Sequence, residues 1–227
     1  MQEHPLDNPI WTALTTGNQH LSFGTAAAKY IKRDVGFFAA MQINSAEGLE
    51  QIRSMLTTPG GIILFTPGAI AIPACWKVKV YRAIYQMTGE TTKVVANNDP
   101  RVQPMTDEHI PAMLALTKLT QPGPFLQRTI DYGNYEGIHV DEQLAAMAGQ
   151  RLRAENYTEV SAICTHPNHS GKGYGGLLLQ RQVNAILEAG AIPFLHVYPE
   201  NPAVRLYEKT GFRIRKEMAV YFLEPSG

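Results

Sequence analysis

The chain has 227 residues, a length that accommodates one large domain or two small ones. Apolar residues make up 44% of it and charged residues 18%, which is typical of globular proteins with a buried core. Its 20 lysines and arginines balance its 20 aspartates and glutamates, so it has no overall basic field and we expect no nucleic-acid partner. An anionic ligand would have to be held by a local site.

The N-terminus and the longest apolar run give no sign of a secretory signal or a membrane segment. The first residues lack a basic stretch followed by an apolar core. The apolar run between Gly60 and Cys75 is interrupted by Pro67 and Pro73, so it cannot cross a bilayer as one helix. We therefore expect a cytoplasmic protein with no membrane partner.

Cysteine and histidine positions suggest neither a disulfide framework nor a metal site. The two cysteines, Cys75 and Cys164, lie far apart, and Cys164 falls in an apolar run typical of a buried, inert thiol. His166 and His169 flank a proline in a loop, and their spacing indicates no third ligand. We expect no bound metal.

The N-terminal part has a mixed helix and strand pattern that ends at a polar stretch. The spacing of apolar residues predicts a short helix over 46–56 and buried strands over 62–65 and 78–87. Turn-forming residues are concentrated between Thr91 and Pro104, which indicates a loop or linker. We therefore divide the chain into an N-terminal α/β region of unknown role, residues 1–95, and a second domain, residues 101–227.

The pattern after the linker is sharper. A helix is predicted to begin near Thr106, with acidic residues in its first turn, and to end before the prolines at 122 and 124. Helices are also predicted over 175–189 and 201–210, each followed by a glycine. Strands are predicted over 137–140, 144–152, 160–165, 192–197, 212–215 and 218–223.

A glycine-rich segment, residues 171–176 (GKGYGG), lies between a predicted strand and a predicted helix. Glycines let the main chain approach a ligand closely, and a helix N-terminus offers unpaired N–H groups and the positive end of the dipole. The loop therefore indicates a phosphate site, although a flexible turn would have a similar composition. A Walker A motif is excluded because Lys172 is followed by glycine. A dinucleotide-binding domain is disfavoured because residues 166–170 separate strand and loop, and only about fifty residues follow.

Two segments together resemble the signatures of the GNAT superfamily of N-acetyltransferases. In that family a strand and a proline precede Gln/Arg-Gly-x-Gly-x-Gly/Ala, which opens a leucine-rich helix; residues 163–178 read ICTHPNHSGKGYGGLL, with Ser170 at the Gln/Arg position. Residues 201–212 read NPAVRLYEKTGF, similar to the family's second pattern of Asn, Ala and Leu-Tyr-x-x-x-Gly-Phe. The resemblance covers residues 101–224 and implies an α+β fold, a mixed, mostly antiparallel sheet flanked by helices.

The resemblance implies that acetyl-CoA is the co-substrate. Main-chain N–H groups of the glycine-rich loop would bind its pyrophosphate, and Lys172 would either contact a phosphate or remain solvated. The main chain at Thr165, where the strand splays from its neighbour, would polarise the thioester carbonyl, and Asn201 would contact the pantetheine arm or a water bound to it. The implied coenzyme-binding residues are Ile163, Thr165, Ser170, Gly171, Lys172, Gly173, Tyr174, Gly175, Gly176 and Asn201.

Two residues are candidates for the proton transfers of such a reaction. Tyr207 matches the family's tyrosine acid, which protonates the leaving thiolate; packing alone is the other interpretation. Glu159 precedes Thr165 by six residues, so strand alternation places both on one face. Some family members have a glutamate base there, whereas a surface carboxylate at a strand end is equally consistent with the sequence.

The acceptor pocket is less defined. In the family, the loop after the first helix contributes to it, which suggests Phe125 against an apolar group and Arg128 against a carboxylate, unless both are structural. We expect a monomeric or homodimeric enzyme that acetylates a small primary amine by direct attack in a ternary complex. The alternative is a non-catalytic acyl-CoA-binding or sensing module. One hypothesis for residues 1–95 is a degenerate second copy of the same fold.

Overall fold

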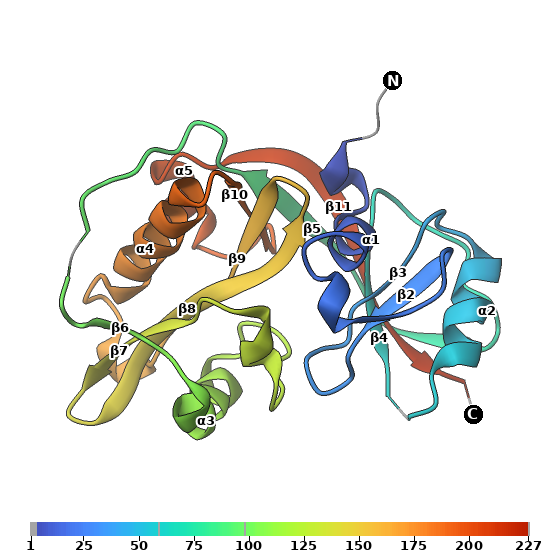
Figure 1. Ribbon diagram of the computed structural model, residues 1–227, viewed down its shortest axis with the longest axis horizontal. Helices are drawn as coiled ribbons and strands as arrows, with labels where there is room; N and C mark the ends of the chain where they lie inside the picture. Colours follow the sequence, from blue (N-terminus) through green and yellow to red (C-terminus); the bar gives the residue numbers. More distant parts are fainter. Residues whose placement is uncertain (1–3, 59, 98, 227) are drawn as a thin grey trace.

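The computed structural model describes residues 4–58, 60–97 and 99–226. Its main feature is an eight-stranded sheet with the strand order β4-β11-β5-β10-β9-β8-β7-β6 (Figure 1). The strands are β4 (Ile62–Thr66), β5 (Trp76–Thr88), β6 (Val102–Pro104), β7 (Glu136–Val140), β8 (Gln143–Ala154), β9 (Tyr157–Thr165), β10 (Ile192–Val197) and β11 (Arg213–Pro225).

The sheet is antiparallel except at one position. Strands β9 and β10 run parallel, and every other neighbouring pair in the sheet is antiparallel. This confirms the predicted mixed, mostly antiparallel sheet flanked by helices. Strands β4 and β5 come from the first predicted region, so both regions contribute to one sheet. The division of the chain between residues 95 and 101 stays a prediction.

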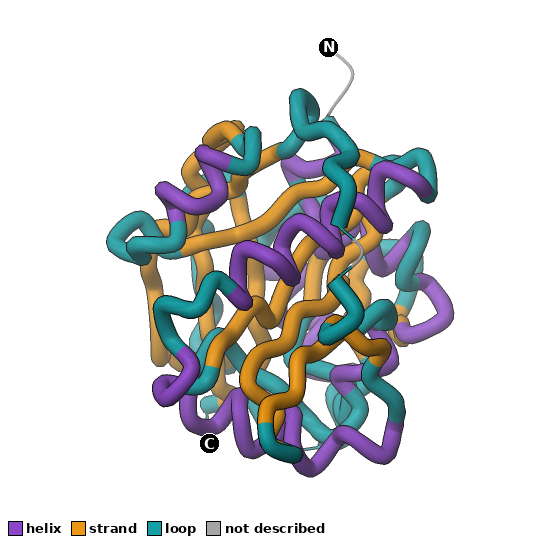
Figure 2. Tube along the Cα trace, turned by 90° about the vertical axis from the view of Figure 1, so that its left-hand side faces the viewer, coloured by secondary structure: helices purple, strands orange, loops and turns teal. Residues whose placement is uncertain are grey.

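Helices cover both faces of the sheet (Figure 2). Helix α4 (Tyr174–Glu188) and the short α5 (Val204–Lys209) pack on one face, where Leu179, Val183 and Ile186 of α4 meet Leu195 and other residues of the strands. Helices α1 (Pro9–Thr15) and α3 (Ile110–Thr120) pack on the other face. Apolar side chains every three or four residues give α4 its buried stripe, as its sequence predicts.

The rest of the N-terminal region lies beside the large sheet (Figure 1). A small antiparallel sheet of β1 (Ser22–Gly24), β2 (Ala28–Ile31) and β3 (Ala39–Met41) packs with helix α2 (Ala46–Met55). The hydroxyl of Ser45 caps α2 by accepting a hydrogen bond from Gly48 N–H at 3.1 Å. Short 3₁₀ helices connect these elements at Pro5–Asp7, Gln19–Leu21, Asp107–His109, Thr129–Tyr132 and Pro167–His169.

One prediction about the C-terminus is wrong. Two strands were predicted over 212–215 and 218–223, but β11 is one continuous strand over Arg213–Pro225. Its partners on β5 are Met87 for Ile214 and Gln86 for Lys216, so Arg215 is an extra residue in a β-bulge. The polar residues between the two apolar runs resemble a turn in the sequence. The strand continues through them because the bulge accommodates the extra residue.

None of the helices in the described ranges combines the length and apolar character needed to cross a lipid bilayer.

We expect Gly149→Ala to lower the free energy of unfolding by about 1–3 kcal/mol, the usual range for overpacking. A Cβ at Gly149 would lie 2.4 Å from Cδ1 of Tyr135, whose ring is buried in the core. Urea unfolding followed by circular dichroism measures the change. Gly68→Ala is the matched control, because a Cβ there has no neighbour within 4 Å. Similar losses in both variants would contradict the close packing at Gly149.

Candidate functional site

Strands β9 and β10 separate after a short stretch of pairing. The parallel pairing joins Ile192–Phe194 to Tyr157–Glu159 only. Beyond it, β9 continues beside β8, and residues 195–197 of β10 continue beside β5. The main chain on the inner side of this opening therefore has no strand partner in the described part of the sheet, so its polar groups are available to a ligand.

A β-bulge in β9 lies at the opening. Ala162 has φ of 52°, and the pairing with β8 shifts by one residue between Ser161 and Cys164. The extra residue reverses the alternation of side chains along the rest of the strand. This corrects the expectation that Glu159 and Thr165 share one face: Cys164 packs on the α1/α3 side, whereas Thr165 faces Gly175 of α4.

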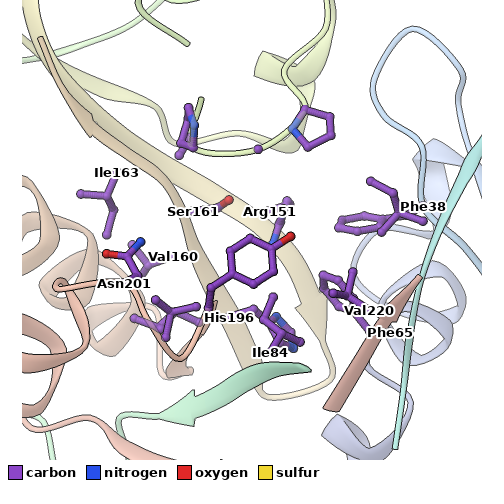
Figure 3. A pocket seen from close by; sticks show the side chains of 18 of the residues that line it. Phe38, Phe65, Ile84, Arg151, Val160, Ser161, Ile163, His196, Asn201 and Val220 are labelled. Atoms are coloured by element: carbon purple, nitrogen blue, oxygen red, sulfur yellow. The ribbon is translucent and has the colours of Figure 1, made fainter. Parts of the chain in front are cut away.

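A cavity of about 170 Å³ occupies the opening (Figure 3). Residues of β9 and β10 line it, and Asn201 lies on the same side as Val160 and Ile163 (Figure 3). Tyr207 is also a lining residue. Phe38, Phe65 and Val220 lie on the opposite side, and Ile84 of β5 lies beside His196 (Figure 3). Ile63 also lines the cavity. The loop at residues 122–124, Arg151 and residues 160–163 complete the lining.

The glycine-rich loop runs from the end of β9 to the start of α4. Gly171 and Gly173 have φ of 76° and 79°, in the left-handed region that favours glycine, and Gly173 is the N-cap of α4. Within the described residues, the N–H groups of residues 171–176 donate to no protein acceptor. They form a cluster of unpaired donors at the positive end of a 15-residue helix, which suits a phosphate.

The surroundings of the loop also leave room for a ligand. A Cβ added to Gly171 or Gly173 would meet no atom within 4 Å, so the loop is open on its outer side. Ser170 and Lys172 are exposed, and Lys172 Nζ lies 3.2 Å from Nδ1 of His169. The ring of Tyr174 is buried against α4 and β7, so only its main chain is available to a ligand.

The structure brings Tyr207 and Asn201 to the cavity. Burial raises the pKa of Tyr207 to about 12, so its phenol stays protonated at neutral pH. Asn201 Oδ1 accepts a hydrogen bond from Ala203 N–H at 2.9 Å at the start of α5. Its amide nitrogen therefore remains the group that can donate to a ligand. Ile163 also lines the cavity, whereas Thr165 is not among the lining residues.

Glu159 lies at the centre of a buried ionic cluster. Its carboxylate accepts two hydrogen bonds from Arg151, from Nε at 2.8 Å and from Nη2 at 2.7 Å. His196 Nδ1 lies 2.7 Å from Oε1 of the same carboxylate and must donate its proton to it. The carboxylate has no exposed surface, and burial favours its neutral form, but Arg151 and His196 outweigh that effect and lower its pKa to about 2.

The two predicted acceptor-binding residues lie outside this cavity. Phe125 packs edge-on against Tyr135, with 5.7 Å between the ring centroids, and lines a separate surface depression beside α3. Arg128 forms ion pairs with Asp131 and, at 3.0 Å, with Asp107. These contacts give Arg128 a structural role in holding the segment after α3.

Sequence reasoning missed part of the site. Arg151, Ser161 and His196 line the cavity, as do Phe38 and Phe65 from the N-terminal region. The signal for Arg151 and His196 is a charged or titratable side chain inside an apolar strand, which needs a buried partner. Nothing local in the sequence marks Phe38 or Phe65, because they reach the cavity through long-range packing. In the described ranges, no group of three or more His, Cys, Asp or Glu side chains is placed to hold a metal.

Comparison with known proteins gives one family-model match and a set of similar structures. The model described as FR47-like protein matches residues 135–221. No curated protein matches the chain. A solved GNAT-family protein from Novosphingobium aromaticivorans is 32% identical, with a TM-score of 0.92, covering 99% of this chain and 100% of that one.

More distant structures share the fold. A GCN5-related N-acetyltransferase from Kribbella flavida has a TM-score of 0.66 at 18% identity, covering 96% of this chain and 95% of that one. A GCN5-related N-acetyltransferase-like protein from Streptococcus suis has a TM-score of 0.58 at 15% identity, covering 95% and 92%. Because the Novosphingobium relative is similar in sequence and fold over nearly the whole chain, this protein belongs to the GNAT family of acetyltransferases.

Proposed function

We propose that the protein transfers an acetyl group from acetyl-CoA to a small primary amine, which attacks the thioester directly in a ternary complex. The observation that carries the proposal is that the glycine-rich loop and the cavity adjoin through Ile163. This residue lines the cavity, and its Cγ2 lies 3.8 Å from the position of a Cβ added to Gly175. A coenzyme held at the loop therefore has a short path for its pantetheine arm into the cavity.

The chain's own groups fit each part of the coenzyme. Unpaired N–H groups of residues 171–176 bind the pyrophosphate, and Lys172 adds a positive charge beside them. The amide nitrogen of Asn201 donates to the pantetheine arm. The main-chain N–H groups of Ile163 and Thr165, which point away from β8 where β9 has left β10, polarise the thioester carbonyl.

The reaction moves two protons. The amine nitrogen attacks the carbonyl carbon, the carbon–sulfur bond breaks, the nitrogen loses a proton and the thiolate gains one. Tyr207 lines the cavity with a protonated phenol and gives its proton to the sulfur. The nitrogen releases its proton to solvent. The tyrosinate then takes a proton from solvent, which restores the phenol.

Glu159 has a role other than proton acceptor in this proposal. A carboxylate with a pKa of about 2, fully enclosed and bonded to Arg151 and His196, is a weak and inaccessible base. We propose that Glu159 holds the Arg151 guanidinium in place at the cavity wall. The amine then enters in its neutral form, drawn from the deprotonated fraction in solution.

Gly175→Asp tests the phosphate cradle. An aspartate in the first turn of α4 favours the helix dipole, so we expect the melting temperature without ligand to hold or rise. The same charge repels the pyrophosphate, so we expect the dissociation constant for acetyl-CoA, measured by calorimetry, to rise at least tenfold. Gly175→Asn is the matched neutral control. A Cβ added at this position would lie 3.6 Å from Thr165 Oγ1, an ordinary van der Waals contact. Equal affinities for the two variants would contradict phosphate binding at this loop.

Tyr207→Phe tests the proton donor. The ring keeps its packing, so we expect unchanged acetyl-CoA binding and a loss of about 100-fold in the rate of thiol release, as for removal of a general acid. Tyr81→Phe, at an exposed residue of β5, is the control. If no amine in a broad panel gives thiol release while acetyl-CoA still raises the melting temperature, the chain is a binding or sensing module and the proposal fails.

The pH profile tests the absence of a protein base. Glu159 is ionised above its pKa of about 2, and Tyr207 is protonated below its pKa of about 12. Neither titrates between about pH 5 and 10, so kcat/KM should rise with pH only as the acceptor deprotonates. Two acceptors with different amine pKa values should give ascending limbs displaced by that difference. If kcat/KM rises at the same pH for both acceptors, the ionisation that causes the rise belongs to a protein group.

A further inference from the structure

Arg151 has one guanidinium nitrogen left over from its ion pair. Nε and Nη2 are both bonded to Glu159, and within the described residues no acceptor lies at Nη1. The side chain is 21% exposed, and Arg151 lines the cavity, whereas the partner carboxylate has no exposed surface. The guanidinium plane is fixed by two hydrogen bonds and by Phe38, whose ring centroid lies 4.9 Å from Cζ. Nη1 is therefore a pre-oriented donor.

Other hydroxyl groups lie around Arg151. Ser161 lines the same cavity and is half-buried there, so its hydroxyl can donate to a ligand (Figure 3). A smaller cavity of about 20 Å³ shares Phe38 and Arg151 with the larger one and is also lined by Tyr132. The Tyr132 hydroxyl is buried with no hydrogen-bond partner among the described residues. The region around Arg151 thus has spare donors and no spare carboxylate.

The charges at the cavity favour an anion over a polycation. Arg151 is the only lysine, arginine, aspartate or glutamate among the residues described as lining it. The nearest carboxylate, Glu159, is enclosed and already accepts from Arg151, His196 and Leu152 N–H. A polyamine would therefore find no free counter-ion in the wall, whereas an oxyanion would find Nη1 of Arg151.

We propose that the acceptor amine carries a carboxylate, which binds Nη1 of Arg151 and the hydroxyl of Ser161. This inference rests on the proposed acetyl transfer and names the acceptor class for that site. The apolar wall formed by Phe38, Phe65 and Ile84 contacts the hydrocarbon part of the acceptor. A cavity of about 170 Å³ is slightly larger than one of about 150 Å³ that holds benzene. The class is thus a small amino carboxylate, such as an amino acid with an apolar or aromatic side chain.

A matched set of amines tests the carboxylate. Phenylalanine, phenylalaninamide and phenethylamine share one ring and one primary amine, and leucine, leucinamide and 3-methylbutylamine form a second set. Thiol release with acetyl-CoA is measured for each, and the rate is divided by the fraction of deprotonated amine. We expect kcat/KM to be at least tenfold higher for a carboxylate than for its amide or decarboxylated counterpart in at least one set.

Two variants place the preference on the named residues. Arg151→Lys keeps a positive charge beside Glu159 but removes the guanidinium group, which can bond Glu159 and a ligand together. Ser161→Ala removes only a hydroxyl that lines the cavity. We expect the ratio of kcat/KM for carboxylate over decarboxylated amine to fall at least tenfold in the first variant and at least threefold in the second. Exposed Arg205→Lys and Ser54→Ala are controls that should keep the wild-type ratio.

A binding measurement separates this inference from the proposed reaction. With coenzyme A present, the carboxylate should raise the melting temperature of the wild type more than the decarboxylated amine does. The rise caused by the carboxylate should be smaller in Ser161→Ala than in the wild type. If this shift occurs without thiol release, the carboxylate site stands and the proposed acetyl transfer fails. If amines are acetylated with no carboxylate preference, the inference is overturned and acetyl transfer stands. If neither activity nor a carboxylate-dependent shift is seen, both are overturned.

Discussion

A chain of partly buried hydrogen bonds across neighbouring strands holds the candidate site in place. Arg215 on β11 donates to Gln86 on β5 at 2.8 Å, and Gln86 Nε2 lies 3.3 Å from Nε2 of His196 on β10. His196 donates to Glu159 on β9, which in turn accepts from Arg151 on β8. Gln86, His196 and Glu159 each have partners on two neighbouring strands, so moving one strand would leave polar groups unpaired. Such a loss costs about 3–5 kcal/mol when a charged partner is removed, although the intact pair adds little net stability. The chain therefore fixes geometry more than it adds stability.

Two bulges make that geometry possible. On β8, Arg151 and Leu152 are together opposite Glu159, since Gln150 pairs with Val160 and Arg153 with Thr158. This lets the Arg151 guanidinium and the Leu152 N–H reach one carboxylate. On β9, the bulge at Ala162 turns Thr165 toward α4, shortly after the pairing with β10 ends at Glu159. The same strand thus holds the ionic cluster on one face and adjoins the glycine-rich loop on the other.

The sequence predicted the elements with strong local patterns and missed those set by distant contacts. The helix from residue 174 and the strand at 192–197 have clear apolar periodicity and clear glycine boundaries, and the structure has both. The bulge at Ala162 has no local signal, because alanine rarely adopts positive φ and nothing in Ser161-Ala162-Ile163 indicates it. The pairing of Arg151 with His196 through Glu159 depends on strand order, which the local pattern did not provide. The glycine-rich loop has a local signal because its unpaired N–H groups and positive φ angles depend on main chain and glycine, whereas the cavity wall depends on tertiary packing.

The N-terminal region gains a physical role from the same packing. Its residues showed no recognisable chemistry in the sequence, yet Phe38, Ile63 and Phe65 form part of the cavity wall. Phe38 also lies against the Arg151 guanidinium, and the ring centroids of Phe65 and His196 are 4.5 Å apart. The glycine-rich loop belongs to the C-terminal half, so in the proposed reaction the two halves have different roles: the C-terminal half offers the donors for a phosphate, and the N-terminal half shapes the cavity beside them. If the proposed function holds, substitutions in the N-terminal wall change which amine fits and leave the N–H groups of the glycine-rich loop unaltered.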